Sequence, residues 1–452
     1  MNQQIFREYD IRGKVDDDLT FEVVEAIGMA YGTMVRRMGL ETVTCGRDGR
    51  THSERLQGYL MNGMQKTGLK VIDIGQCPTP LLYFSIFHLD THGGIQVTGS
   101  HNPPEFNGFK ICIGKETIYG DRIQEIRRII ENGVFEHGNG TIEKVDIMEP
   151  YFKYMKDNIK ISSPIKVVVD AGNGVAGPVA PRVLKDQGVE VVELFCDVDG
   201  TFPNHHPDPT IPENLKTLQE AVLEHGADCG VAFDGDGDRL GVVDEKGGIL
   251  FGDQLLMIFA RDLLKDNPGA AIIGEVKCSQ VMYDDIASHG GRPIMWKTGH
   301  SLIKKKMKEE NALLAGEMSG HIFFADRYFG FDDGVYAALR FCEILSKSSI
   351  PASRLLEDVP KTYSTPEIRV ECPEEIKFKL VRRLVQYFKE ETEYEVIDVD
   401  GARVIFPDGW GLIRASNTQP VLVLRFEATS KQSLKKIQAL MEEVLARFKD
   451  EF

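Results

Sequence analysis

The clearest guide to the fold is the stretch Lys166-Val167-Val168-Val169-Asp170-Ala171-Gly172-Asn173-Gly174, a β-branched run that ends in a glycine-rich loop. A helical stretch near 178–187 follows it, and a second β-branched run comes at 189–194. Strand–helix–strand units of this length favour parallel pairing with a right-handed crossover. The stretch therefore predicts one unit of an α/β domain.

The same pattern occurs twice more along the chain. One copy joins strands at 43–48 and 70–74 through a helix near 52–67, and another joins strands at 271–275 and 293–296 through a helix near 279–289. The copies lie roughly 110 to 120 residues apart, which is too long for a solenoid repeat. We therefore expect three related α/β domains with mixed sheets, in which these units pair in parallel.

The last ninety or so residues follow a different pattern, with strands in series between two helices. The expected helices cover 374–390 and 431–448, and the expected strands cover 395–400, 402–406 and 421–428. This order predicts a small C-terminal α+β domain. The shifts in pattern give four domains, at 1–146, 147–248, 249–361 and 362–452.

Charge, apolar runs and cysteine spacing indicate which partners and compartments are compatible with the chain. The chain of 452 residues has 53 Lys and Arg against 69 Asp and Glu, a net charge of −16, which disfavours nucleic acid. A local basic cluster still allows an anionic small substrate. No run of 18 apolar residues occurs and the first residues lack an apolar leader, so we expect no membrane span and no secretory signal. The eight cysteines form no CxxC pair, which favours reduced thiols in the cytoplasm.

The first loop with chemical potential is Thr98-Gly99-Ser100-His101-Asn102-Pro103-Pro104, with Lys110 a few residues later. Consecutive prolines reduce backbone freedom and hold the nearby serine in place. A fixed hydroxyl suits nucleophilic or phosphoryl-carrier chemistry, and Lys110 could neutralise an anion beside it. The alternative is an ordinary turn in which Ser100 caps a helix.

The second loop is Asp234-Gly235-Asp236-Gly237-Asp238-Arg239, in which three carboxylates alternate with glycines. Glycine lets the backbone fold tightly, so the three carboxylates can converge on one Mg²⁺ ion. An EF-hand is excluded because Arg239 stands where that loop demands glycine. The alternative is an acidic turn without a ligand, and we expect the loop to be exposed rather than part of a core.

Two further loops carry weaker signals. Glu317 and Ser319 lie between glycines in Gly316-Glu317-Met318-Ser319-Gly320-His321, which suits hydrogen bonds to sugar hydroxyls but also fits a plain hairpin turn. Arg414-Ala415-Ser416-Asn417-Thr418 offers a guanidinium fork and neutral donors for phosphate, or a strand-to-strand loop with a solvated arginine. The basic runs at 304–306 and 382–383 predict solvated helix faces.

Taken together and in this order, the four loops resemble those of the α-D-phosphohexomutase superfamily over the whole chain. The resemblance implies four domains around a central cleft. It also implies a phosphoserine at Ser100, with Ser100, Asp234, Asp236 and Asp238 around Mg²⁺. The implied reaction interconverts hexose 6-phosphate and hexose 1-phosphate through a hexose 1,6-bisphosphate, which is also the activator.

The resemblance assigns roles to the remaining residues. It places Arg12 and Lys110 beside the transferring phosphoryl group, with His300 among the candidates for acid–base work. The implied substrate contacts are Tyr9, His101, Arg239, Lys277, His300, Glu317, Ser319, His321, Arg414, Ser416, Asn417 and Thr418. The C-terminal domain with Arg414 is expected to swing over the cleft.

The opening Phe6-Arg7-Glu8-Tyr9-Asp10, the methionine in GEMSGH and the RASNT loop are similar to the bacterial phosphomannomutase/phosphoglucomutase group. This similarity implies mannose or glucose phosphates as substrates and a monomer or dimer. Phosphoglucosamine mutase activity stays open as an alternative, as does a non-catalytic sugar-phosphate sensor. An intact Ser100 and three aspartates argue against a sensor, which needs no phosphoryl carrier.

Overall fold

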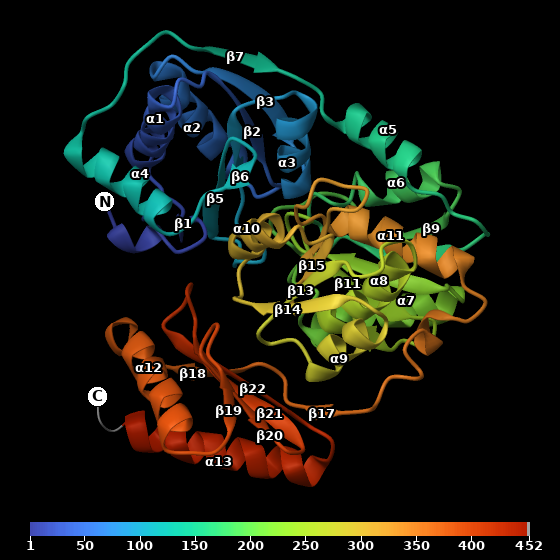
Figure 1. Cartoon of the computed structure of the whole chain (residues 1–452). Helices are drawn as coiled ribbons and strands as arrows, with labels where there is room; N and C mark the ends of the chain where they lie inside the picture. The colour runs from blue at the N-terminus through green and yellow to red at the C-terminus, as the bar shows by residue number, and fades with distance from the viewer. Residues whose placement is uncertain (450–452) are drawn as a thin grey trace.

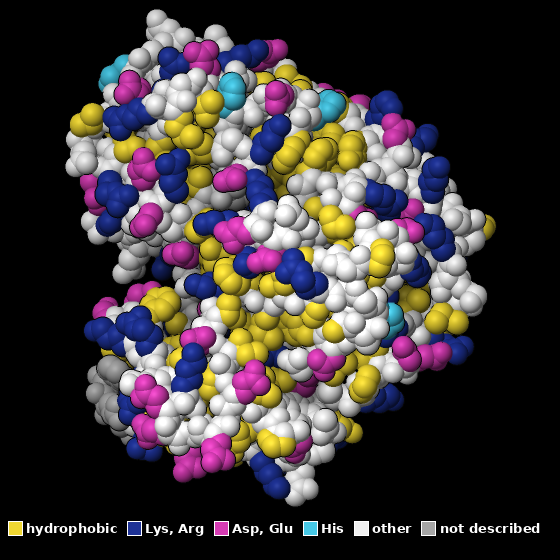
Figure 2. All heavy atoms as spheres, viewed as in Figure 1, with side chains coloured by type: hydrophobic (Ala, Val, Ile, Leu, Met, Phe, Trp, Pro, Cys, Tyr) yellow, Lys and Arg dark blue, Asp and Glu magenta, His cyan; other side chains and the backbone are white. Residues whose placement is uncertain are grey.

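The computed structural model describes residues 1–449, and Figure 1 shows them as four sheet-containing domains that follow one another along the chain. Domains I, II and III form the upper and right-hand parts of that view, and domain IV lies below them. Figure 2 shows a hollow between the N-terminal and C-terminal lobes. Among the described residues, no helix combines the length and apolar character needed to cross a bilayer.

Domain I is a mixed sheet with helices on both faces. Its strands follow the order β1-β5-β4-β2-β3-β7, with β6 beside β5, and β2 pairs in parallel with both β3 and β4. Helices α1, α2 and α4 cover one face, and α3 covers the other. The strands are β1 (Ile11–Lys14), β2 (Thr42–Arg47), β3 (Lys70–Gln76), β4 (Gly93–Val97), β5 (Phe106–Ile113), β6 (Glu116–Thr117) and β7 (Thr141–Lys144). The helices are η1 (Gln3–Ile5), α1 (Phe21–Arg37), α2 (Ser53–Lys66), α3 (Thr79–His88) and α4 (Asp121–Asn132).

Domain II contains the β-branched stretch and glycine-rich loop at residues 166–174. Val167, Val168 and Val169 are fully buried because β8 is a central strand, covered on both faces. It pairs in parallel with β9, as the strand–helix–strand pattern predicted, and also with β10. The strands, in sheet order, are β12 (Ile249–Leu250), β11 (Leu240–Asp244), β10 (Cys229–Phe233), β8 (Lys166–Asp170) and β9 (Glu190–Leu194). The helices are α5 (Met148–Asn158), α6 (Ala180–Asp186), η2 (Pro212–Leu215) and α7 (Lys216–His225).

Domain III repeats the parallel core on a smaller scale. Strand β13 pairs in parallel with β14 and β15, and β16 closes the sheet as an antiparallel edge. The strands, in sheet order, are β14 (Arg292–Trp296), β13 (Ala271–Glu275), β15 (Leu314–Gly316) and β16 (Ile322–Phe324). The helices are α8 (Gly252–Asp266), α9 (Gln280–Ser288), α10 (His300–Glu310), α11 (Gly334–Lys347) and η3 (Ala352–Arg354).

Domain IV is antiparallel throughout, with both helices on one face of its sheet. Alternation along β21 turns Trp410, Leu412 and Arg414 to the opposite face, toward domain III and the cleft. The strands are β17 (Tyr363–Ser364), β18 (Ile368–Glu371), β19 (Glu395–Ile397), β20 (Ala402–Phe406), β21 (Gly409–Ala415) and β22 (Val421–Ala428). The helices are α12 (Glu374–Glu390) and α13 (Lys431–Lys449).

An aromatic cluster joins the first three domains. The Phe84 ring, on α3 of domain I, lies 5.4 Å from that of Tyr151 on α5 and 6.3 Å from that of Phe329, just after β16. Aromatic pairs at such distances add to the free energy of burial. The expected class, three related α/β domains with mixed sheets and an α+β domain around a central cleft, is confirmed.

Candidate active site

The Ser100 loop leaves the carboxyl end of β4 and enters the junction between domains I and II. Ser100 is buried and adopts φ +48°, an unusual conformation for a residue with a side chain. Its Oγ donates a hydrogen bond of 2.9 Å to Asp234 Oδ2 and lies 3.1 Å from His101 Nδ1. The rigid hydroxyl therefore faces the acidic loop of the neighbouring domain.

The acidic loop connects β10 to β11, and its burial corrects the sequence analysis. Asp234, Asp236 and Asp238 are each 0% exposed, so the expectation of an exposed loop was wrong. A Cβ added at Gly235 would meet the Ser100 carbonyl oxygen at 2.5 Å. The glycines therefore serve close packing against domain I as well as the tight turn.

Lys110 of domain I is a cationic neighbour of the three carboxylates, beside His321 and Arg239. Lys110, on β5, donates to Asp236 Oδ2 at 2.8 Å and also to Asp238. Asp236 Oδ1 is buried without a hydrogen-bond partner. Burial, together with the charges of Asp236 and Asp238, raises the pKa of Asp234 well above its usual value. Ligand oxygens from the three aspartates lie within 4.8 Å of one another, so the residues present fit a divalent cation.

Arg12 and His101 complete the surroundings of Ser100. Arg12, on β1, pairs with Asp10 at 2.7 Å and donates to the Gly99 carbonyl and to Asn102 Oδ1. Burial, assisted by Arg239 and Arg12, lowers the pKa of His101 well below its usual value. A neutral imidazole and a fixed guanidinium thus flank the hydroxyl.

The hairpin turn between β15 and β16 reaches the same loop from domain III. Glu317 accepts from Gly299 N–H at 2.6 Å, and it lies 2.8 Å from Nδ1 of His321. The His321 Nε2 lies 3.2 Å from Asp238 Oδ1, and Ser319 Oγ lies 3.0 Å from Nδ1. Although burial opposes it, Asp238 and Glu317 raise the pKa of His321 to about 9. The turn therefore presents a charged imidazolium to the acidic loop.

Arg239 and His300 bring positive charge and a third imidazole to the site. Arg239 lies 3.9 Å from Asp208 and 3.8 Å from Asp234. The His300 ring begins α10 and lies 5.9 Å from the His321 ring and 6.5 Å from that of Tyr9. Burial, then Lys304 and Lys110, lower the pKa of His300 well below its usual value, so this imidazole is neutral.

Lys304, one turn along α10 from His300, is largely shielded from solvent although the sequence predicted a solvated helix face there. The run at 304–306 was expected to be a solvated face, which is right for Lys305 but wrong for Lys304. The Lys304 side chain is 11% exposed and binds Asp332 at 2.9 Å. Lys306 lies half-buried over the Trp296 ring. Packing on Tyr83 of domain I covers Lys304, and Trp296 of domain III covers part of Lys306, so these two lysines are not solvated as predicted.

Domain IV contributes the last group of predicted residues. Arg414 lies inside β21 rather than in a loop, and both its Nε and Nη2 lie 3.0 Å from Asp400. Asn417 donates to Tyr9 Oη, which itself donates to the Thr298 carbonyl at 2.7 Å. Ser416 Oγ accepts from the backbone N–H groups of residues 418 and 419, and lies 3.4 Å from Thr418 Oγ1. The RASNT segment thus reaches across the hollow to domain I.

Lys277 lies between domains III and IV. Its Nζ is 3.1 Å from Glu367 and 3.6 Å from Glu275. The structure therefore brings the predicted residues together in two groups: those around the acidic loop, and those where domain IV meets Tyr9 and Lys277. The acids that fix these cations were not predicted from the sequence, because single carboxylates give no signal of the cation they will pair with; they are Asp10, Asp208, Glu275, Asp332, Glu367 and Asp400.

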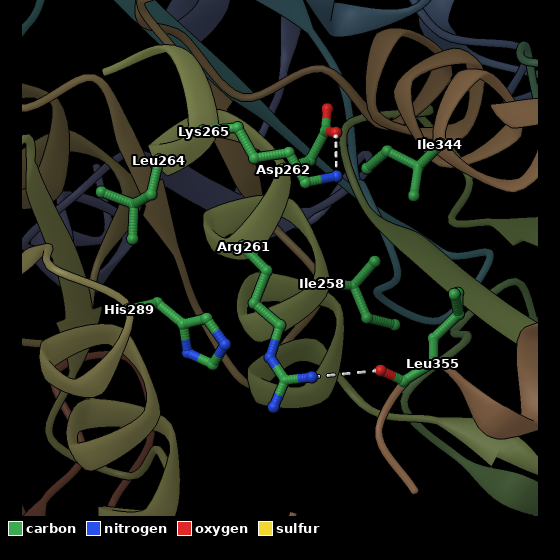
Figure 3. Close-up of a pocket in the computed structure, with 8 residues that line it drawn as sticks. All are labelled: Ile258, Arg261, Asp262, Leu264, Lys265, His289, Ile344 and Leu355. Carbon is green, nitrogen blue, oxygen red and sulfur yellow. Dashed lines mark hydrogen bonds and ion pairs between the residues drawn. The ribbon is translucent and has the colours of Figure 1, made fainter. Parts of the chain in front are cut away.

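A separate surface pocket of about 380 Å³ lies on the outer side of α8, and Figure 3 shows its lining. Its basic groups are already paired, Arg261 with Asp285 and Asp358, and Lys265 with Asp262. None of the four loops lines it. The cleft, not this pocket, is the candidate active site.

Comparison with known proteins decides the family. Four models described as phosphoglucomutase/phosphomannomutase domains match, with alpha/beta/alpha domains I, II and III at residues 3–137, 149–248 and 251–363 and the C-terminal domain at 367–444. The chain belongs to the phosphoglucomutase/phosphomannomutase family. The predicted superfamily resemblance, and with it an enzyme of the isomerase class, is confirmed.

Individual relatives of this family span nearly the whole chain. The chain is 50% identical to a phosphomannomutase/phosphoglucomutase of Pseudomonas aeruginosa, over 98% of this chain and 95% of the relative. It is 46% identical to a phosphoglucomutase of Neisseria meningitidis, over 98% and 97%. A crystal structure of a phosphoglucomutase/phosphomannomutase family protein from Burkholderia thailandensis superposes with a TM-score of 0.94, at 46% identity and covering 99% and 98% of the two chains.

Proposed function

We propose that this chain interconverts hexose 6-phosphates and hexose 1-phosphates, with mannose, glucose or both as the sugar. The observation that carries the proposal is the 2.9 Å hydrogen bond from Ser100 Oγ to Asp234, which joins a rigid hydroxyl to a buried acidic loop. The similarity to a phosphomannomutase/phosphoglucomutase of Pseudomonas and a phosphoglucomutase of Neisseria supports the same substrates.

A carrier hydroxyl solves a geometric problem of this reaction. The oxygens on C1 and C6 of one hexose are too far apart for a phosphoryl group to move between them in line. A phosphoserine at Ser100 transfers its phosphoryl group to the free sugar hydroxyl: the bond from phosphorus to Oγ breaks and a bond to the sugar oxygen forms. The resulting hexose 1,6-bisphosphate turns over, and Oγ takes back the other phosphoryl group. Free bisphosphate therefore also activates an unphosphorylated enzyme.

Mg²⁺ is the cation that best suits this loop, held by Asp234, Asp236, Asp238 and the phosphoserine. When bound, it supplies positive charge against the charge that develops on the transferred phosphoryl group. The unpartnered Asp236 Oδ1 and the convergence of the three carboxylates within 4.8 Å of one another support this assignment.

The surrounding residues contact the phosphoryl group on Ser100, the sugar and the second phosphate. Arg12 and Lys110 neutralise the phosphoryl group on Ser100, and His101 orients the hydroxyl. Sugar contacts come from Tyr9, Arg239, Lys277, His300, Glu317, Ser319 and His321. The phosphate that is not being transferred binds Arg414, Ser416, Asn417 and Thr418, since an arginine fork and neutral donors suit a phosphate dianion.

Further proposals concern the protein as a whole. Its partners are hexose phosphates rather than nucleic acid or membrane, and it works as a monomer or a dimer. Eight unpaired cysteines, seven of them buried, support a reducing compartment such as the cytoplasm. Domain boundaries after residues 146, 248 and 361 are supported by the ranges of the four family matches.

Intact mass and a coupled assay test the proposal together. After treatment with glucose 1,6-bisphosphate, the mass should rise by one phosphate, localised to Ser100, and Ser100→Ala should not gain it. Mannose 1-phosphate and glucose 1-phosphate should be converted, and glucosamine 1-phosphate poorly. Phosphate on another serine of active enzyme would reject the carrier, and a preference for glucosamine 1-phosphate would favour the phosphoglucosamine alternative.

A further inference from the structure

Asp332 is a buried carboxylate at the edge of the cleft that belongs to none of the four loops. It lies between β16 and α11, and a backbone bridge with Phe323 fixes its place. Its side chain is 0% exposed. One oxygen, Oδ1, accepts from Lys304 Nζ at 2.9 Å, whereas Oδ2 has no hydrogen-bond partner.

The first turn of α10 presents two side chains to this carboxylate. His300 and Lys304 are four residues apart, so they project from the same face of the helix. Lys304 Nζ also lies 4.1 Å from the centroid of the Tyr83 ring, which belongs to α3 of domain I. The lysine is therefore held from both sides, and its contact fixes the orientation of the Asp332 carboxylate.

The second oxygen of Asp332 faces an equally unsatisfied group. His300 Nδ1 is buried, has no hydrogen-bond partner and lies 3.8 Å from Asp332 Oδ2. Two unpartnered polar atoms side by side in a protein interior are rare. A shift of about 1 Å would bring them to hydrogen-bond distance, and such bonds often tighten only when a ligand binds.

We propose that Asp332 is a positioning residue, which accepts a hydrogen bond from Nδ1–H of His300 and so leaves Nε2 unprotonated to accept a hydrogen bond from the ligand. The proposal rests on the proposed function only in naming that ligand as a sugar hydroxyl. Burial, then the charges of Lys304, Lys110 and His321, lower the pKa of His300 against the opposing charge of Asp238, so the neutral ring carries a single N–H. The partner of that N–H decides the tautomer.

Asp332→Asn gives a sharp test because Lys304 offers only donors. The lysine holds the amide oxygen of the new side chain, so its NH₂ group faces Nδ1 of His300. Nδ1 must then accept a hydrogen bond, and the proton moves to Nε2. In the full chain labelled with ¹⁵N-histidine, two-bond ¹H–¹⁵N correlations report the tautomer, and the His300→Gln variant assigns the signal.

We expect protonated Nδ1 in the wild-type protein and protonated Nε2 in Asp332→Asn. The variant should lose about 5- to 30-fold in kcat/KM for glucose 1-phosphate, as expected for one lost hydrogen bond to the ligand. Adding Lys304→Met to Asp332→Asn frees the amide to turn its oxygen toward Nδ1, and this double variant should recover the wild-type tautomer. Lys305→Met, on the exposed side of the same turn, is the matched control and should change neither readout.

Two results would overturn the proposal. One is a wild-type His300 protonated at Nε2, which is measured without any change at Asp332 and so does not depend on whether that variant folds. The other is an Asp332→Asn variant with the wild-type tautomer. The tautomer is read in the free protein, so a chain without mutase activity would reject the proposed function and leave this measurement decisive for Asp332.

Discussion

The contacts among domains I, II and III differ in kind from the contact between domains III and IV. One continuous hydrophobic core runs through the first three domains, from Ile72 of domain I to Ala352 of domain III. Domain IV has its own core, which begins at Cys372 and ends at Phe448. The apolar link between this domain and the rest is a small cluster around Val276, Trp410 and Leu412.

Polar groups supply most of the remaining connection to domain IV. Arg403 is buried, donates to the carbonyls of Val276 and Cys278, and stacks 3.8 Å over the Trp410 ring. Ser279 donates to Glu427 across the same contact. Such a contact can be exchanged for water at lower cost than a shared core, so the first three domains form one body to which domain IV docks. A docked domain is what a lid over the cleft requires.

The largest effect is expected in the acidic loop, which lies inside the body formed by the first three domains. Asp236→Asn removes one carboxylate from the group that Lys110 contacts, and turnover should fall about 100-fold or more because charge stabilisation of the transferred group is lost. Steady-state rates at several Mg²⁺ concentrations measure this. Asp262→Asn, on the surface of α8, is the control. Full turnover of Asp236→Asn without added Mg²⁺ would show that the loop holds no catalytic metal.

A smaller effect is expected from opening the contact with domain IV. Arg403→Ala removes a charged donor from two buried carbonyls, at a cost of about 3 kcal/mol. Domain IV should then unfold separately, seen as a second transition in scanning calorimetry, while the core of the first three domains keeps its melting temperature. Arg382 is exposed on α12, so the control variant Arg382→Ala should give the same calorimetric trace as the wild-type protein. A single transition shifted as a whole would mean that domain IV is not an independent unit.

The smallest effect concerns the ion pair between Lys277 and Glu367. Lys277 lowers the pKa of Glu367 to about 2, against an ordinary value of 4.5. The pair therefore stabilises the folded state above about pH 4.5, and this contribution disappears as the pH falls toward 2. Because Glu367 is partly exposed, we expect only about 1 kcal/mol. Urea unfolding of wild type and Glu367→Gln at pH 6 and pH 3.5 measures the difference, which should shrink at the lower pH. Glu371→Gln, with an exposed side chain, should show no such change.

In domain IV, the elements with a clear local sequence pattern were predicted correctly. The helix at 374–390 and the strands at 402–406 and 421–428 occur at those residues. Strand β21 was missed because Gly409-Trp410-Gly411 continues a turn signal, and its extended form depends on pairing with β20 and β22. Asp332 was missed for a similar reason, since only the packing of three domains buries that carboxylate.

The aromatic cluster around Phe84 has a consequence for how the chain is made. Phe84 cannot contact Phe329 until that residue, about 245 residues later in the chain, has left the ribosome. At about 5 to 20 residues per second, the part of the α3 face that contacts Phe329 stays uncovered for roughly 12 to 50 seconds of synthesis, even after Tyr151 of α5 has been made. Domain IV has no such delay, because its helices and sheet come from one continuous segment. The nascent chain therefore exposes part of an apolar surface on domain I during about half of its synthesis.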